Sequence, residues 1–226
     1  MKGDLNELLE LIEKDCTIYT MFKQCPYEIL RKVRVRHYGQ GRFRLSQGGI
    51  SDTFYIIIKG TVGIYVESEH GKRYTITTYE KGDYIGELEI FRRAPYVSGV
   101  EAKGAVSVLE IDRDVFLEWI HMDRNFNEYM MQTMCDTSYN MCRNMAENIL
   151  YPLKQRVCQY VIENGDKNRN SGIPLHTETL GVQMAVTPRS VSRVIKLLKE
   201  KGIISIKKGR IFIEDREALI REKDIK

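Results

Sequence analysis

The sequence predicts an α+β protein in three successive parts: a β-rich N-terminal part, a long helix, and a C-terminal part of short helices followed by a β-hairpin. Residues 36–111 contain short β-rich runs separated by glycines about every ten residues. Apolar residues then keep helical spacing to about residue 150, and two shorter helical patterns precede a basic turn near the C-terminus. We therefore expect domains at residues 1–112, 113–150 and 151–226.

The composition is that of a globular protein without a targeting or membrane segment. The chain has 226 residues, 42% of them hydrophobic, which is enough to bury a core. Its first residues alternate charged and apolar side chains, unlike a secretory signal, and no run approaches the roughly 18 apolar residues of a membrane helix. Five scattered cysteines favour free thiols over a disulfide framework. We expect a cytoplasmic protein with no membrane partner.

Charge is distributed unevenly along the chain. Residues 149–226 hold about 16 Lys and Arg against about 9 Asp and Glu, whereas the rest of the chain holds about 19 against about 22. A basic segment joined to a mildly acidic one predicts a polyanionic partner for the C-terminal third. A lysine-rich solvated surface is the alternative.

Four runs of the N-terminal part have the composition of strands, at residues 53–59, 62–67, 74–79 and 106–111. Glycines lie between these runs, where tight turns require positive φ. In the last run a polar Ser107 between two valines fits a strand with one solvated face. Short strands at this spacing predict a β-roll or jelly roll.

One long helix is expected from residue 115 to about residue 150. Its apolar side chains recur at spacings near three, four and seven residues. They are Phe116, Ile120, Phe126, Met130, Met134, Met141 and Met145. A helix this long on a small domain commonly pairs with its twin as a coiled coil, which predicts a homodimer. The alternative is a helix folded back on the β-rich part, with the methionines buried there.

A further helix is expected after the long one. Pro152 suits a first helical turn, and Asn164 with Gly165 would end the helix. Residues 149–151 would then form a hinge, and the polar stretch 165–172 has the composition of a loop.

Residues 177–202 have the pattern of two short helices joined at residues 185–186, the layout of a helix-turn-helix. The residues suited to the helix ends are Thr177 and Thr187 as N-caps, Pro188 at a first helical position and Gly202 as a stop. Apolar residues of the second helix fall at i, i+3, i+4 and i+7, which predicts one buried face. They are Val191, Val194, Ile195 and Leu198.

The opposite face of that second helix has the side chains of a DNA reader. Arg can form bidentate bonds with guanine, while Ser and Lys reach base edges or phosphates. Residues 203–213 then have the pattern of a hairpin with a basic turn, and residues 187–210 hold about eight basic side chains against one acidic. We predict a winged helix-turn-helix that binds double-stranded DNA. The expected contacts are Thr187, Arg189, Ser190, Ser192, Arg193, Lys196, Lys207, Lys208 and Arg210.

From about residue 32 to residue 214 the chain resembles the Crp/Fnr family of transcriptional regulators. Three stretches carry the resemblance: DTFYIIIKG at 52–60, KGDYIGEL at 81–88 and RSVSRVI at 189–195. The second stretch resembles the family's phosphate-binding cassette, in which a Glu holds a ribose hydroxyl and a later Arg neutralises a cyclic phosphate. The resemblance implies a dimer that binds a near-palindromic operator, contacts RNA polymerase and responds to a small effector.

Several positions depart from the family's cAMP-binding members. Val97 stands at the position of the phosphate-binding Arg, beside a matching Ser98, and Met141-Cys142 replace a Thr-Ser pair that meets adenine. Losing a charge-assisted phosphate pair costs several kcal/mol, so we expect an effector other than cAMP, or none. The alternative is that Arg92 or Arg93 takes the role of the missing phosphate-binding arginine. The expected effector-binding residues are Gly86, Glu87, Leu88, Val97, Ser98, Met134, Met141 and Cys142.

The recognition helix also departs from the family. The resemblance implies that Arg193 reads guanine, but Arg189 stands where the family commonly has Glu. The operator should therefore differ from those that an Arg-Glu helix reads.

No cofactor can be named from the sequence. Cys16 and Cys25 are nine residues apart, and no Cys-x-x-Cys pair suggests an iron–sulfur cluster. The four histidines lack a paired metal-ligand spacing, so we expect no metal and no cupin-type enzyme activity; haem is left open. Two functions remain: a regulator gated by an effector, and a constitutive DNA-binding dimer whose β-rich domain senses no ligand.

Overall fold

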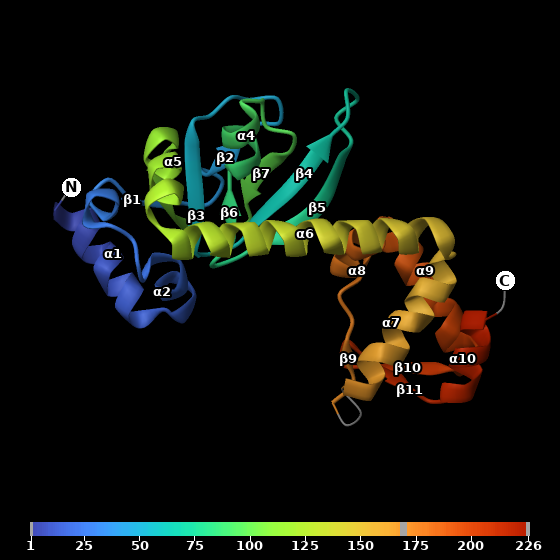
Figure 1. The fold of residues 1–226 in the computed structure, drawn as a ribbon. Helices are drawn as coiled ribbons and strands as arrows, with labels where there is room; N and C mark the ends of the chain where they lie inside the picture. Colours follow the sequence, from blue (N-terminus) through green and yellow to red (C-terminus); the bar gives the residue numbers. More distant parts are fainter. Residues whose placement is uncertain (1, 168–170, 225–226) are drawn as a thin grey trace. The chain divides into compact units, whose positions relative to one another are not determined.

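The computed structural model describes residues 2–167 and 171–224. The chain divides into two compact units, Met1–Cys135 and Asp136–Lys226, with the division inside one long helix. The fold is α+β, as the sequence predicts: the first unit combines a strand-rich roll with helices, and the second is mostly helical (Figure 1). The three domains expected from the sequence, with boundaries after residues 112 and 150, remain a prediction.

The first unit contains a β-roll made of two four-stranded sheets. The strands are β1 (Arg34–Tyr38), β2 (Arg44–Leu45), β3 (Thr53–Lys59), β4 (Val62–Glu67), β5 (Arg73–Tyr79), β6 (Tyr84–Ile85), β7 (Gly99–Ala102) and β8 (Val106–Asp112). One sheet has the order β1-β8-β3-β6 and the other β2-β7-β4-β5, and their pairs are antiparallel. The four strands expected from the sequence are all present.

Helices cover one face of the β1-β8-β3-β6 sheet. They are α1 (Lys2–Lys14), α2 (Cys16–Phe22), α3 (Tyr27–Leu30), α4 (Glu87–Arg92), α5 (Arg113–Met122) and α6 (Arg124–Leu150). Strand β3 is buried on both sides because it separates two cores. Phe54 and Ile56 pack with the helices, whereas Tyr55 and Ile57 pack inside the roll. This explains why β3 is a continuous apolar run rather than an alternating one.

The chain begins with three helices, a feature not expected from the sequence. Leu8, Ile18 and Met21 of the first two helices are fully buried in the same core as Trp119 and Phe126. These contacts come from residues about 100 positions further along the chain, and such tertiary packing outweighs weak local propensity.

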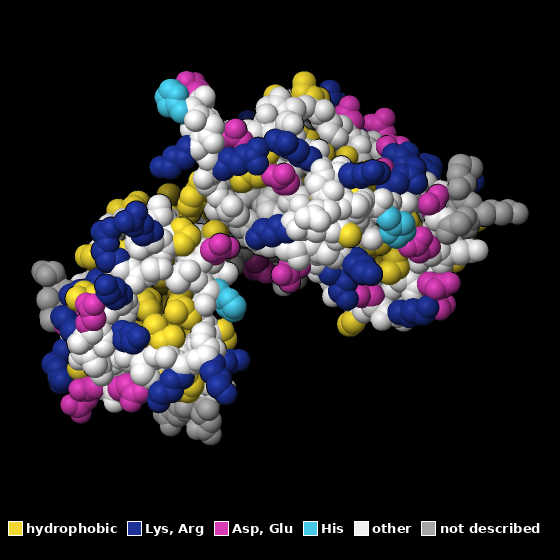
Figure 2. Space-filling model, turned by 180° about the vertical axis from the view of Figure 1, so that it is seen from behind, with side chains coloured by type: hydrophobic (Ala, Val, Ile, Leu, Met, Phe, Trp, Pro, Cys, Tyr) yellow, Lys and Arg dark blue, Asp and Glu magenta, His cyan; other side chains and the backbone are white. Residues whose placement is uncertain are grey.

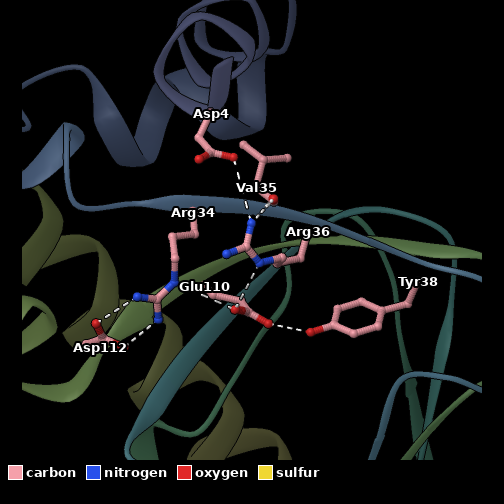
Figure 3. Close-up of polar contacts among 7 residues, drawn as sticks. All are labelled: Asp4, Arg34, Val35, Arg36, Tyr38, Glu110 and Asp112. Atoms are coloured by element: carbon pink, nitrogen blue, oxygen red, sulfur yellow. Dashed lines mark hydrogen bonds and ion pairs between the residues drawn. The ribbon is translucent and has the colours of Figure 1, made fainter. Parts of the chain in front are cut away.

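An ion cluster ties β1 to β8 and to α1 (Figure 3). Arg34 donates to both carboxylate oxygens of Asp112 at 2.5 and 3.0 Å. Arg36 lies 3.9 Å from Asp4 of α1 and 3.8 Å from Glu110 of β8. The cluster therefore holds the first helix against the edge of the sheet.

The sequence predicts one helix from residue 115 to about residue 150, and this prediction is wrong. The structure has two helices, α5 and α6, with a break at Asp123. The Asp123 side chain is buried and accepts hydrogen bonds from Trp119 Nε1 at 3.0 Å and Phe126 N at 3.1 Å. It thus acts as the N-cap of α6 and holds the extended backbone that separates the two helices.

The second unit has a small three-stranded sheet and helices around one core. Its elements are the C-terminal part of α6, α7 (Leu153–Lys167), β9 (Ile173–Pro174), α8 (Thr177–Gln183), α9 (Pro188–Glu200), β10 (Ile204–Lys207), β11 (Arg210–Ile213) and α10 (Arg216–Asp224). The strand order is β10-β11-β9, with antiparallel pairs. Within the described ranges, no helix combines the length and apolar composition that crossing a membrane requires.

Helix α7 continues past Asn164 and Gly165, where the sequence suggested its end. Gly165 allows strand β11 to come close to α7, since a Cβ at residue 165 would lie 2.4 Å from Ile213 Cδ1. The Asn164 side chain donates to Tyr160 O at 2.9 Å and so bonds within the helix. The loop expected at 165–172 starts later, and its residues 168–170 lie outside the described part of the chain.

A single guanidinium joins three segments of the second unit. Arg156 of α7 donates to Tyr151 O at 3.0 Å, to Met184 O at 2.7 Å and to Asn148 Oδ1. These acceptors belong to the turn after α6, to the end of α8 and to the last turns of α6.

Candidate functional site

Helices α8 and α9 form the helix-turn-helix that the sequence predicts. The turn between them contains Ala185 in a left-handed conformation, with φ 51°. Gly181 of α8 packs against this turn, where a Cβ would lie 2.9 Å from Val186 O. Any larger residue at this position would push the two helices apart. The N-cap of α8 is His176, one residue before the expected Thr177.

The N-terminus of α9 has the expected cap. Thr187 Oγ1 accepts from Ser190 N at 3.2 Å, and the two hydroxyls lie 3.0 Å apart. Pro188 occupies the first helical position, and Gly202 follows the helix with φ 71°. Thr187 and Ser190, both predicted DNA contacts, therefore also fix the start of the helix.

The two faces of α9 separate as the sequence predicts. Val191, Ile195 and Leu198 are buried in the core of the second unit. The side chains predicted to read DNA are on the exposed surface of the helix: Arg189, Ser192, Arg193 and Lys196. Lys196 lies 3.7 Å from Glu200, whereas the described residues give Arg189 and Arg193 no ion pair. Both guanidinium groups are thus available to a ligand.

Strands β10 and β11 form the wing. Lys208 and Gly209 connect them, both with positive φ (49° and 71°), as a type I′ hairpin turn requires. Lys207 and Lys208 are exposed at this end, and Lys207 lies 3.9 Å from Glu214. Arg210 instead donates to the backbone carbonyls of residues 171 and 172, at 3.0 and 2.9 Å. Its guanidinium therefore holds the segment before β9 in place.

Basic side chains are spread over the visible face of the second unit, around a group of exposed hydrophobic side chains (Figure 2). This arrangement gives the unit a surface that attracts polyanions.

The cassette of the first unit is built around Gly86 and α4. Gly86 has φ 104°, and a Cβ there would lie 2.6 Å from Thr53 O, so only glycine fits. Burial raises the pKa of the next residue, Glu87, to about 7, and the charge of Glu89 adds to the rise. No cation among the described residues offsets this effect. A carboxyl group in such surroundings favours a proton or a hydrogen-bond donor.

The structure brings together five of the eight predicted effector-binding residues. Gly86, Glu87 and Leu88 start α4, and Val97 N donates to Glu89 of the same helix at 3.3 Å, which places Val97 and Ser98 beside it. The Val97 side chain is exposed, and Ser98 is half-buried.

The other three predicted effector residues lie on α6. Met134 is half-buried and belongs to the first unit, whereas Met141 and Cys142 are exposed and belong to the second. All three therefore stay predicted effector residues.

Glu89 was missed by the sequence reasoning. Its side chain is only 9% exposed, and Oε1 accepts the hydrogen bond from Val97 N. The signal available in the sequence was the second carboxylate of Glu87-Leu88-Glu89, directly after Gly86.

Two domain families match this chain. Residues 35–123 match the cyclic nucleotide-binding domain, and residues 155–222 match the Crp-like helix-turn-helix domain. Together these matches span well over half of the chain.

Curated relatives match both parts. The cAMP-activated global transcriptional regulator CRP of Salmonella typhimurium is 24% identical over 168 residues, covering 71% of this chain and 80% of the relative. The cAMP-activated global transcriptional regulator Vfr of Pseudomonas aeruginosa is 25% identical over 170 residues, covering 71% and 79%.

Solved structures share the fold. A CooA variant from Carboxydothermus hydrogenoformans has a TM-score of 0.68 at 16% identity, covering 93% of this chain and 97% of its own. CprK has a TM-score of 0.69 at 17% identity, covering 86% and 91%. With the two domain matches in this order along one chain, the protein belongs to the Crp/Fnr family of DNA-binding transcriptional regulators.

Proposed function

We propose that the protein is a homodimeric transcription factor that binds a near-palindromic operator, with α9 in the major groove and the β10–β11 wing against the phosphates. The observation that carries the proposal is the exposed pair Arg189 and Arg193 on α9, free of ion pairs among the described residues and opposite the buried face. Two such helices in a symmetric dimer would read half-sites about one helical turn apart.

The test is the substitution Arg193→Ala, measured by fluorescence anisotropy on an operator selected from random duplexes. Loss of a bidentate guanine contact should weaken specific binding by about 1 to 3 kcal/mol and leave binding to random duplex nearly unchanged.

The matched control is Lys208→Ala on the wing. A phosphate contact carries no sequence information, so this change should weaken binding to operator and random duplex alike. Equal losses on both duplexes for Arg193→Ala would contradict the base-reading role.

Dimerisation is proposed to use α6. Its exposed apolar side chains Met131, Met141 and Met145 fit the spacing of a coiled-coil seam. Sedimentation equilibrium should show a dimer for the wild-type and a monomer for Met141→Glu, because a carboxylate buried at the seam lacks a partner. A Met141→Glu dimer of unchanged affinity would place the interface elsewhere.

The β-roll is proposed to bind a small effector other than cAMP, which shifts the dimer between states with different DNA affinity. Support comes from Val97, which brings no cation to the cassette, and from Glu87, whose charge no cation among the described residues offsets. Thermal unfolding with cAMP, cGMP, haem and a metabolite panel tests this, since a ligand of the native state raises the melting temperature. Stabilisation by cAMP would overturn the inference.

The second candidate is a constitutive DNA-binding dimer, which the same absence of a cation at Val97 favours. It requires an operator affinity that cell extract and metabolites leave unchanged. In either case we propose that the protein acts in the cytoplasm, with RNA polymerase as its partner at the operator.

A further inference from the structure

A cleft of about 590 Å³ opens on the first unit, and its lining does not include Glu87, Val97 or Ser98 of the cassette. Its walls come from the segment before β3, from α4 and the turn after it, and from the start of α5. This volume is typical of small-molecule sites. The polar residues that line the cleft include Ser51, Asp52, Glu89, Arg93, Arg113 and Asp114.

Glu89 is the most buried charged residue of the cleft, at 9% exposure. One oxygen accepts from Val97 N at 3.3 Å, and the described residues supply this carboxylate with no other donor and no cation. A buried carboxylate with so little compensation is costly in free energy. A ligand that donates hydrogen bonds would remove that cost.

A second incomplete polar group lies beside Glu89. The Tyr96 hydroxyl is buried, in a residue only 5% exposed, and the described part of the chain gives it no hydrogen-bond partner. Burial raises the pKa of Tyr96 to about 12, and the charge of Glu89 contributes to the rise. Ser51, which lines the cleft, is close to this hydroxyl without the geometry of a hydrogen bond. Tyr96 lies behind the lining of the cleft, so on this side the cleft presents the Glu89 carboxylate and the Ser51 hydroxyl.

The opposite charge lies at the end of α4. Arg93 is exposed, and its backbone is left-handed, with φ 52°, which is unusual for a residue other than glycine. Its guanidinium has no ion pair among the described residues. Arg113, by contrast, lies 3.1 Å from Asp114. Asp112 pairs with Arg34, so among the described residues the charged groups of the cleft without an ion pair are Glu89, Asp52 and Arg93.

We propose that this cleft binds an amino acid, with its ammonium group at Glu89 and the hydroxyl of Ser51, and its carboxylate at Arg93. Two unpaired carboxylates against one arginine favour a basic amino acid over an acidic one. The site shares α4 with the cassette through Glu89, but its lining does not include Glu87, Val97 or Ser98, and it does not depend on DNA binding.

The test is isothermal titration of the purified full-length protein with L-lysine, L-glutamate and cadaverine, which is lysine without its carboxylate. Lysine should bind at least about tenfold more tightly than glutamate. Glu89→Gln keeps an acceptor for Val97 N but removes the charge, so the affinity for lysine and for cadaverine should fall by about tenfold or more. Arg93→Asn should weaken lysine by about tenfold and leave cadaverine unchanged, because only lysine has a carboxylate.

Asn tolerates a left-handed backbone, so Arg93→Asn is expected to fold normally. The matched control is Arg92→Asn, which removes an exposed arginine next to the cleft but outside its lining. Its affinities for all three probes should equal those of the wild-type. The proposal is overturned if lysine does not bind at millimolar concentration, if glutamate binds more tightly, or if Arg92→Asn weakens lysine as much as Arg93→Asn does.

Discussion

Asp123 joins two helices through its side chain, and its replacement should destabilise the first unit strongly. In Asp123→Ala the buried indole N–H of Trp119 loses its acceptor at 3.0 Å, and α6 loses the cap on Phe126 N at 3.1 Å. A hydrogen bond to a charged group contributes about 1.5 to 3 kcal/mol, and an N-cap about 1 kcal/mol. We therefore expect Asp123→Ala to lower the free energy of unfolding by about 2.5 to 4 kcal/mol.

Trp119 is the single tryptophan of the chain, so its fluorescence reports unfolding of this unit directly. Urea titrations at one protein concentration should show a lower midpoint for Asp123→Ala with an unchanged slope. Asp123→Asn keeps one acceptor oxygen and should lose only about 1 to 2 kcal/mol. A loss below about 0.5 kcal/mol for Asp123→Ala, or equal losses for the two variants, would refute the reasoning.

Three further predictions concern glycines and one carboxyl group. The pKa of Glu87 is raised from 4.5 to about 7 in the folded protein, so folding favours the protonated carboxyl. The free energy of unfolding should therefore fall by on the order of 2 kcal/mol as pH rises through this range. Urea titrations at pH 5 and pH 8 measure the fall, which Glu87→Gln should abolish. Gly86→Ala forces a Cβ onto a backbone oxygen and should cost about 2 kcal/mol or more, against about 1 kcal/mol for Gly71→Ala in open space, both measured by urea unfolding. In an Ile213→Val background, where the contacting Cδ1 is absent, Gly165→Ala should stabilise the protein by about 0.5 to 1 kcal/mol, because alanine favours a helix over glycine. In the wild-type background it should not stabilise the protein, and equal effects in the two backgrounds would contradict the clash.

The helix-turn-helix and wing were predictable from sequence because their signals are local. Thr187 and Pro188 cap α9 within one turn, and the positive φ of Lys208 and Gly209 belongs to a two-residue hairpin. Likewise the strands β3 and β4 match the expected residues at both ends.

What the sequence did not reveal depends on tertiary contacts. Asp123 interrupts a helical pattern because its carboxylate accepts a hydrogen bond from a buried indole. Gly165 lies inside α7, where Ile213 comes too close to leave room for a Cβ. Glu89 is buried only because the chain returns at Val97. The cleft beside Glu89 combines three separate segments, so no single stretch of sequence predicts it.

The three bonds of Arg156 have a mechanical consequence for the second unit. Since one guanidinium bonds to Asn148, Tyr151 and Met184, the end of α6, the connecting turn and the end of α8 form one rigid junction. Bending at the residue 149–151 hinge expected from the sequence would have to break these bonds. A rotation of α8 and α9 would therefore move the last turn of α6 with them as one rigid body.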